Sequence, residues 1–150
     1  MSQSDAHRDL VLATARAIRQ RHPNVLIQTD LQESPGDPVP PLIGGYRPDI
    51  IGRWVSPCPD LFIAEAKTDS DMARQHTLDQ IDAFVGHLCT LRRGVGTFIL
   101  TVDGRIADRA KTVLQFACRR HVSSRLCVQL FDGLDFWGLD PIGVPQWRLS

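Results

Sequence analysis

Three stretches of the chain repeat apolar residues every three to four positions, which is the period of an α-helix. The expected helices span residues 5 to 21, 71 to 93 and 106 to 120. Ser4 is the expected N-cap of the first helix, and Asp69 or Ser70 is the expected N-cap of the second. Gly94 is expected to end the second helix.

Shorter apolar stretches separated by turn residues predict β-strands. The expected strands span residues 25 to 33, 46 to 54, 60 to 67, 96 to 103 and 125 to 132. Residues 34 to 45 hold four prolines and three glycines and are expected to form a loop, which could select the substrate. The tail from Gly133 could add an edge strand around residues 146 to 149.

The order of these elements predicts the fold class. Helix, three strands, helix, strand, helix, strand (αβββαβαβ) indicates an α/β protein with a central mixed β-sheet flanked by helices. A chain of 150 residues suits a single domain, spanning 1 to 150, with one hydrophobic core. We find no internal repeat.

Composition narrows the functional classes. Apolar residues make up 43% of the chain and charged residues 23%, so an intrinsically disordered protein is not expected. The formal net charge is zero, which argues against a protein that coats nucleic acid by bulk electrostatics but leaves room for a local basic patch. No apolar stretch approaches the roughly 20 residues of a membrane span, and the first ten residues lack the build of a signal peptide. A cytoplasmic protein without a membrane partner is therefore expected.

The four cysteines show neither CxxC nor CxxH spacing; they are Cys58, Cys89, Cys118 and Cys127. They are predicted to be reduced core residues rather than a zinc site or a disulfide framework.

Candidate chemistry lies at the end of the third expected strand. The chain has only two glutamates and two lysines, and one of each, Glu65 and Lys67, follows the apolar run of residues 61 to 64. If the second and third strands form a hairpin centred on Pro57, Asp49 and Glu65 lie opposite one another, because each is eight residues from Pro57. Side chains alternate along a strand, so Lys67 shares the face of Glu65.

Two carboxylates placed opposite one another repel and need an offsetting charge. A divalent cation such as Mg²⁺ takes oxygen ligands, commonly one or two carboxylates, and the carbonyl of Ala66 is a possible further ligand. Such an ion lowers the pKa of bound water and stabilises charge on a phosphoryl oxygen, while a nearby ammonium orients the nucleophile. Asp49, Glu65 and Lys67 are therefore the candidate site for phosphodiester hydrolysis.

Pro48-Asp49, fifteen intervening residues and Glu65-Ala66-Lys67 together resemble the motif of the PD-(D/E)XK nuclease superfamily. The element order is similar to its restriction-endonuclease-like core over residues 5 to 132, nearest to small Holliday-junction resolvases and restriction-type nucleases. The resemblance implies a Mg²⁺-dependent endodeoxyribonuclease, with Mn²⁺ as a substitute, in which Asp49 and Glu65 bind the metal and Lys67 positions the attacking water.

The resemblance also implies a polar residue on the next helix, which would be Gln80, with Thr77 one turn earlier. An acidic residue from the first helix would be Asp9, with Glu33 a less favoured substitute. A homodimer is expected for cutting two strands of DNA, because two-fold symmetry matches a duplex.

Several other residues could contact nucleic acid. Residues 92 to 125 hold eight Arg or Lys and two Asp, and a phosphate-contacting surface or a solvated basic surface is expected from Arg92, Arg93, Arg119, Arg120 and Arg125. Stacking on bases is possible for Trp54, Trp137 and Trp147, with core packing as the default. A solvated face, rather than a second metal site, is predicted for Asp69, Asp71, Asp79 and Asp82.

Three alternatives to a DNA nuclease stay open. The Glu65 and Lys67 pair could be purely structural. The same fold could be a catalytically inactive module that binds nucleic acid or a protein partner. The same metal chemistry could act on RNA.

Overall fold

A computed structural model describes residues 3–32, 34–54, 60–72, 74–121 and 123–139. Its helices are α1 (Gln3–Arg21), α2 (Gln75–Leu88) and α3 (Ala107–Cys118), with two 3₁₀ turns, η1 (Asp69–Asp71) and η2 (Gly104–Ile106). Its strands are β1 (Val25–Thr29), β2 (Ile50–Trp54), β3 (Leu61–Ala66), β4 (Gly96–Thr101), β5 (Leu126–Phe131) and β6 (Phe136–Leu139). These elements follow the order expected from the sequence, with β6 added.

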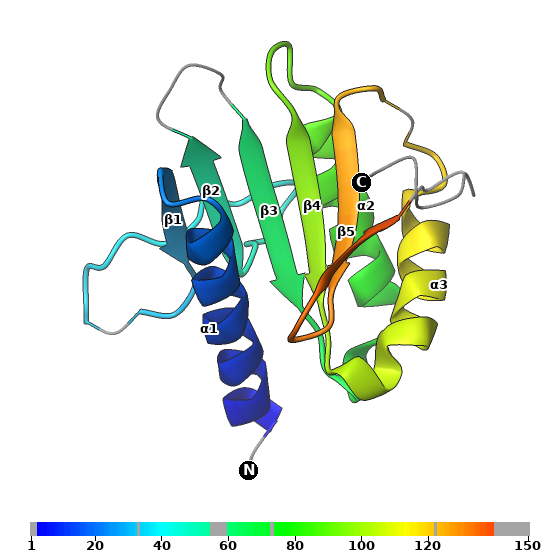
Figure 1. Ribbon diagram of the computed structural model, residues 1–150, viewed down its shortest axis with the longest axis horizontal. Helices are drawn as coiled ribbons and strands as arrows, with labels where there is room; N and C mark the ends of the chain where they lie inside the picture. The colour runs from blue at the N-terminus through cyan, green and yellow to red at the C-terminus, as the bar shows by residue number, and fades with distance from the viewer. Residues whose placement is uncertain (1–2, 33, 55–59, 73, 122, 140–150) are drawn as a thin grey trace.

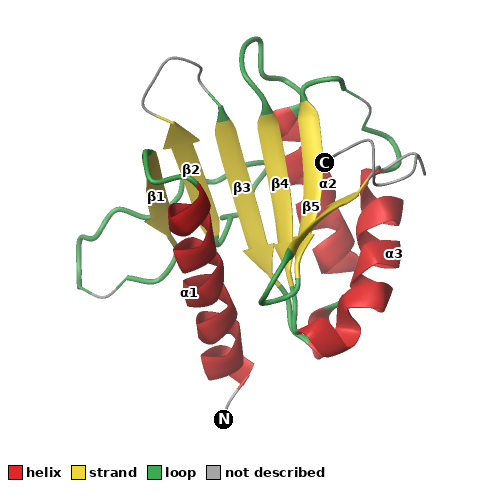
Figure 2. Cartoon of the chain, in the orientation of Figure 1, coloured by secondary structure: helices red, strands yellow, loops and turns green. Residues whose placement is uncertain are grey.

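All six strands belong to one mixed sheet, in the spatial order β1 to β6. Strands β1, β2 and β3 run antiparallel, β3, β4 and β5 run parallel, and β6 returns antiparallel to β5. Helix α1 lies on one face of the sheet, and α2 and α3 lie on the other (Figures 1 and 2). The expected α/β class with a mixed sheet flanked by helices is confirmed.

Several expected boundaries were wrong. Helix α1 begins at Gln3, so Ser4 lies inside the helix and does not cap it. Helix α2 begins only at Gln75, because residues 69 to 71 form η1, and the Thr77 hydroxyl donates to the Asp71 carbonyl at 2.6 Å. Helix α2 then ends at Leu88, well before Gly94.

The first strand is also shorter than expected. Strand β1 ends at Thr29, because its ladder with β2 runs from Val25 opposite Trp54 to Thr29 opposite Ile50, where β2 begins. The expected edge strand at residues 146 to 149 lies outside the described residues, as do Glu33, Cys58 and Trp147. The edge strand that the structure describes is β6.

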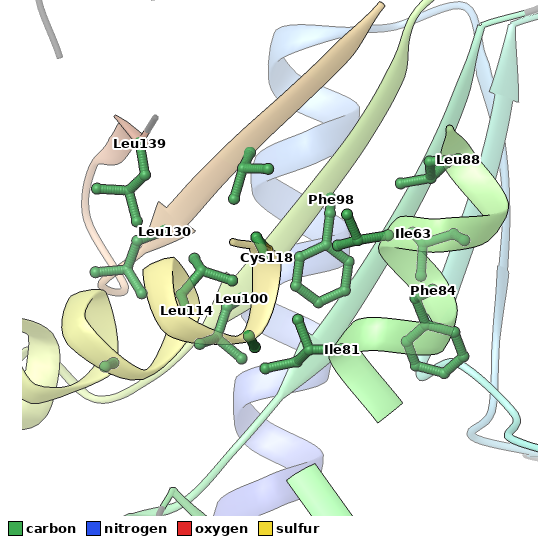
Figure 3. Packing of buried hydrophobic residues seen from close by; sticks show 14 of the residues in the cluster. Ile63, Ile81, Phe84, Leu88, Phe98, Leu100, Leu114, Cys118, Leu130 and Leu139 are labelled. Atoms are coloured by element: carbon green, nitrogen blue, oxygen red, sulfur yellow. The ribbon is translucent and has the colours of Figure 1, made fainter. Parts of the chain in front are cut away.

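Alternation along the central strands divides the apolar residues between the two faces of the sheet. Ile63, Phe98 and Leu100 pack with α2 and α3 in the larger core (Figure 3). Phe62 and Ile99, their neighbours along the strands, pack against α1 in the smaller core. The face of a residue can therefore be read from its register, and Glu65 and Lys67 follow Ile63 onto the α2 side.

The proline-rich loop between β1 and β2 ends against helix α2. Ile43 and Tyr46 form an isolated bridge around Gly44 and Gly45, both with positive φ, a conformation that glycine adopts without steric cost. A Cβ on Gly44 would lie 2.9 Å from the Cβ of Ala83, so only glycine lets the loop approach α2 this closely. The end of this loop, close in sequence to Asp49, is thus fixed in place.

No helix in the described part of the chain has both the length and the apolar character needed to cross a membrane. Within the same residues, Cys89, Cys118 and Cys127 are free thiols. Burial raises the pKa of Cys118 to about 12, which leaves it an inert core residue, as the sequence predicted.

Candidate active site

The register expected for the second and third strands is confirmed. Ile50 pairs with Ala64 and Ile51 with Ile63, and extending this antiparallel ladder by one residue places Asp49 opposite Glu65. Counting from Pro57 is therefore sufficient to align the two acids. Asp49 itself immediately precedes β2, and Glu65 is the second-last residue of β3.

Reciprocal hydrogen bonds join the Asp49 and Glu65 segments. The Asp49 amide donates to Oε1 of Glu65 at 2.8 Å, and the Ala66 amide donates to Oδ2 of Asp49 at 2.9 Å. Each carboxylate thus accepts a backbone N–H from the neighbouring segment, which fixes both side chains at the end of the β2–β3 ladder. These bonds stabilise two acids that would otherwise repel.

Lys67 and Gln80 complete the cluster from one residue beyond β3 and from the middle of α2. The Lys67 ammonium donates to Oε1 of Gln80 at 2.5 Å and lies 3.5 Å from Oε2 of Glu65. All four side chains are buried or nearly so; Glu65 is 2% exposed, Asp49 8%, and Lys67 and Gln80 9% each. The structure therefore brings together Asp49, Glu65, Lys67 and Gln80, the four residues that the sequence singled out.

Burial makes the charge on Glu65 costly. Loss of solvent raises the pKa of Glu65 to about 8, and the nearby negative charge of Asp49 adds to the rise. Lys67 and the Asp49 amide act in the opposite direction, but they do not overcome burial. Glu65 therefore needs a further positive charge to be fully ionised at neutral pH.

His7 joins the cluster and was missed in the sequence. Its Nε2 lies 3.1 Å from Oδ2 of Asp49 and donates to it, because an ionised carboxylate only accepts. This hydrogen bond raises the pKa of His7, against the effect of partial burial. His7 lies in the first helix, 42 residues before Asp49, and no spacing rule connects the two; only the way α1 crosses the sheet brings them together.

The donor set fits a hard divalent cation such as Mg²⁺. Two carboxylates are adjacent, and Oδ1 of Asp49 accepts no hydrogen bond from the described residues. The Ala66 carbonyl lies on the strand edge that faces Asp49, because the N–H and C=O of a strand residue share an edge and the Ala66 amide bonds Asp49. Across the described residues, however, no group of three or more His, Cys, Asp or Glu side chains is arranged to hold a metal ion. Any ion here would thus depend on Asp49, Glu65, the carbonyl and outside ligands.

Two further residues considered for the site make no described hydrogen bond or ion pair with Asp49 or Glu65. Asp9 is exposed and lines a separate groove of about 870 Å³ with Asp69 and Asp103, and no described hydrogen bond or ion pair links it to Asp49 or Glu65. Thr77 is buried, and its hydroxyl donates a hydrogen bond to the Asp71 carbonyl.

The acidic group on and before α2 makes exposed or partly exposed pairs, as predicted for a solvated face. Asp69 pairs with Arg109 at 2.7 Å, Asp71 with Arg74 at 3.8 Å and Asp82 with Arg120 at 3.0 Å. Asp79 accepts a hydrogen bond from Gln75 at 2.9 Å.

The five arginines predicted to contact phosphate lie at the opposite end of the sheet from Asp49. Arg92 and Arg93 precede β4, and Arg119, Arg120 and Arg125 precede β5, whereas the candidate site is at the carboxyl end of β3. Because β3, β4 and β5 are parallel, they all begin at the same end of the sheet (Figure 1). These arginines therefore lie away from Asp49 and Glu65, and their contact with nucleic acid stays a prediction.

Comparison with known proteins assigns neither a family nor a function to the chain. No family model matches the chain, and searches of curated proteins and of solved structures return no match.

Proposed function

We propose that this protein is a metal-dependent nuclease of the PD-(D/E)XK type, with a restriction-endonuclease-like fold, that hydrolyses phosphodiester bonds of DNA. One observation carries the proposal: Asp49, Glu65 and Lys67, with Gln80, meet in one buried cluster where β2 begins and β3 ends. Buried charges lower stability unless they are compensated, so such a cluster favours a functional role.

Each residue has a role that follows from its contacts. Asp49 and Glu65 would hold Mg²⁺ or Mn²⁺, with the Ala66 carbonyl as a further oxygen ligand. When bound, the ion would lower the pKa of a water and stabilise charge on the scissile phosphate. The Lys67 ammonium, held by Gln80, would orient the attacking water, and His7 would hold Asp49 in place.

The test is cleavage of supercoiled plasmid and of a labelled four-way DNA junction in Mg²⁺, Mn²⁺ or chelator. Lys67→Met should lower the cleavage rate at least ~100-fold, because the variant keeps the side-chain length but loses the proton donor. The matched control is Lys111→Met, which changes the other lysine of the chain; Lys111 lies on α3 and pairs with Asp108. The control should cut like the wild type.

Cleavage that persists in chelator, or that is equal in the two lysine variants, would contradict the proposal. An RNA substrate run in parallel separates a deoxyribonuclease from a ribonuclease that uses the same site. We further propose a homodimer for cutting duplex DNA, and sedimentation velocity with and without duplex tests it.

A second candidate is a catalytically inactive module of the same fold that binds nucleic acid or a protein partner. Two observations favour it: the described residues hold no set of three metal-binding side chains, and Glu65 is best accommodated in its protonated form. Calorimetric titration with Mg²⁺ separates the two candidates. If the protein is a nuclease, the wild type should bind Mg²⁺ and Asp49→Ala should not. If it is an inactive module, neither the wild type nor Asp49→Ala should bind Mg²⁺.

A further inference from the structure

A second concave site lies on the other face of the sheet, at the other end of β3. It is a pocket of about 320 Å³ beside the carboxyl end of α1. Phe62 lines it from β3 and points to the α1 face, whereas Glu65 points to the α2 face. Its volume falls in the range of small-molecule sites, roughly 300–1,000 Å³.

The floor of the pocket is a continuous strip across three strands. Phe62 of β3 pairs with Thr97 of β4, and Ile99 of β4 pairs with Gln129 of β5. The walls are Trp54 and His22 on one side and Arg21 and Phe136 on the other. Paired strands therefore build the site on a rigid base.

Three rings pack together at the pocket: Phe62 is 3% exposed and supports the rings of Trp54 and His22, which are partly exposed. The rings of Trp54 and Phe62 pack with centroids 4.1 Å apart, and the His22 ring lies 4.9 Å from Trp54 and 5.3 Å from Phe62. Burial and the charge of Arg21 lower the pKa of His22, which keeps its imidazole neutral at pH 7. A flat aromatic ligand fits such a surface, because ring stacking is favourable and tolerant of the ring's identity.

Two polar side chains of the floor have unused hydrogen-bonding capacity. The Thr97 hydroxyl has no hydrogen-bond partner within the described part of the chain, and Thr97 is only 8% exposed. Because no fully buried polar side-chain atom there lacks a partner, this hydroxyl must open into the pocket. The Gln129 amide makes only a weak contact, at 3.7 Å, with the sulfur of Cys127. Both groups are available to the edge of a heteroaromatic ring.

A cation stands at the rim. The Arg21 guanidinium lies over the Phe136 ring, 4.5 Å from its centroid, and makes no ion pair with any described residue. Stacking fixes the guanidinium plane and leaves its N–H edge for a planar anion such as phosphate. A carboxylate also lines the pocket: Asp60, whose Oδ1 accepts a hydrogen bond from the Val95 amide at 2.7 Å, so Arg21 is the group in the lining that can bind an anion.

From these features we propose that the pocket binds a nucleoside monophosphate unit, either as a free nucleotide or as the end of a nucleic-acid strand. The base stacks on the partly exposed Trp54 ring, Thr97 and Gln129 bond its edge, and Arg21 binds the phosphate. The proposal does not rest on nuclease activity, because the pocket shares no residue with the Asp49 cluster.

The experiment is calorimetric titration of the full chain in chelator, so that no strand is cut. The probes are AMP, UMP, adenosine, ribose 5-phosphate and a 5′-phosphorylated trinucleotide. We expect one site per chain for the monophosphates, with ribose 5-phosphate and adenosine each binding at least about tenfold more weakly. Binding of both AMP and the trinucleotide indicates that the pocket accepts a free nucleotide and the end of a strand. Binding of only one of the two probes identifies which of these ligands the pocket takes.

Three variants test the assigned contacts. Arg21→Gln should weaken AMP binding at least about tenfold and Thr97→Val several-fold, both without loss of circular dichroism. Arg19→Gln is the matched control, because Arg19 is exposed on the same helix but does not line the pocket, and it should bind like the wild type. The proposal is overturned if folded protein binds none of the nucleotides, if ribose 5-phosphate binds as tightly as AMP, or if Arg21→Gln and Arg19→Gln behave alike.

Discussion

Two clusters in this protein join an acidic side chain to basic partners, and they differ in burial. The buried cluster holds Glu65 and Lys67 beside Asp49. The exposed cluster joins Asp82 of α2 to His121 at 2.8 Å and to Arg120 at 3.0 Å, beyond the end of α3.

The carboxyl pKa moves in opposite directions in the two clusters. Burial raises the pKa of Glu65, and the adjacent Asp49 charge adds to the rise. Burial alone would also raise the pKa of Asp82, but the hydrogen bonds from His121 and Arg120 outweigh it, and the net shift is downward. The exposed cluster therefore stabilises the fold by linking α2 to α3. In the buried cluster the ionised form of Glu65 is disfavoured by burial, which is typical of a functional site.

The largest expected difference between the clusters is in catalysis. Asp49→Ala should reduce DNA cleavage at least ~100-fold, because it removes one of the two carboxylates proposed to bind the metal. Asp82→Ala should cut within about twofold of wild type, since it only breaks an exposed pair. Plasmid nicking rates measure both, and equal losses in the two variants would remove the functional distinction between the clusters.

The next difference is in the pH dependence of stability. Glu65 has a pKa of about 8 in the folded state against an ordinary value of 4.5, so the native state binds more protons than the unfolded state between these values. Stability should therefore fall as pH rises from about 4.5 to 8, by on the order of a few kcal/mol.

Glu65→Gln should abolish most of this slope in urea unfolding at pH 5 and pH 8.5, because glutamine does not titrate. The matched control Asp82→Asn should keep the slope. A wild-type protein whose unfolding free energy is constant over this range would contradict the assigned pKa of Glu65.

Metal binding should stabilise the buried cluster alone. Mg²⁺ at about 100 times its Kd should add about 2.7 kcal/mol to the free energy of unfolding, because the ion binds the folded protein and not the unfolded chain. Thermal unfolding with and without Mg²⁺ measures the gain. Asp82→Asn should keep this stabilisation by Mg²⁺, and Asp49→Ala should lose it. If Asp49→Ala is stabilised by Mg²⁺ as much as the wild type, the ion binds elsewhere.

The smallest expected effect is on the exposed cluster itself. Asp82→Asn should lower the free energy of unfolding by about 0.5–1 kcal/mol at pH 6, because the pair is partly screened by solvent. The lowered pKa of Asp82 means that this contribution is present above pH 3.8 and is lost as pH falls through the folded pKa. Urea unfolding at pH 6 and at pH 2.5 checks the sign; a cost above about 2 kcal/mol would show that the pair is not simply a surface contact.

Local spacing was sufficient for much of the fold and for the core of the site. The hairpin register followed from counting around Pro57, because antiparallel pairing fixes the sum of the paired residue numbers. The shared face of Glu65 and Lys67 followed from strand alternation. The motif resemblance pointed to Gln80, which lies in hydrogen-bond contact with Lys67.

Features that depend on particular contacts rather than on spacing could not be predicted in this way. The late start of α2 depends on η1 and on the Thr77 bond to Asp71. The arginines before β4 and β5 are concentrated in sequence, but the parallel sheet carries them to the end opposite Asp49.

The sequence by itself determined the element order, the α/β class and the pairing of Asp49 with Glu65, because these depend on periodicity and on short-range counting. Only the tertiary structure decided that His7 of α1 bonds Asp49, and that Arg21, Trp54 and Gln129 enclose a pocket on the opposite face. The physical reason is that these contacts join elements separated by tens of residues. Their geometry depends on how α1 packs across the sheet, and no local pattern encodes that packing.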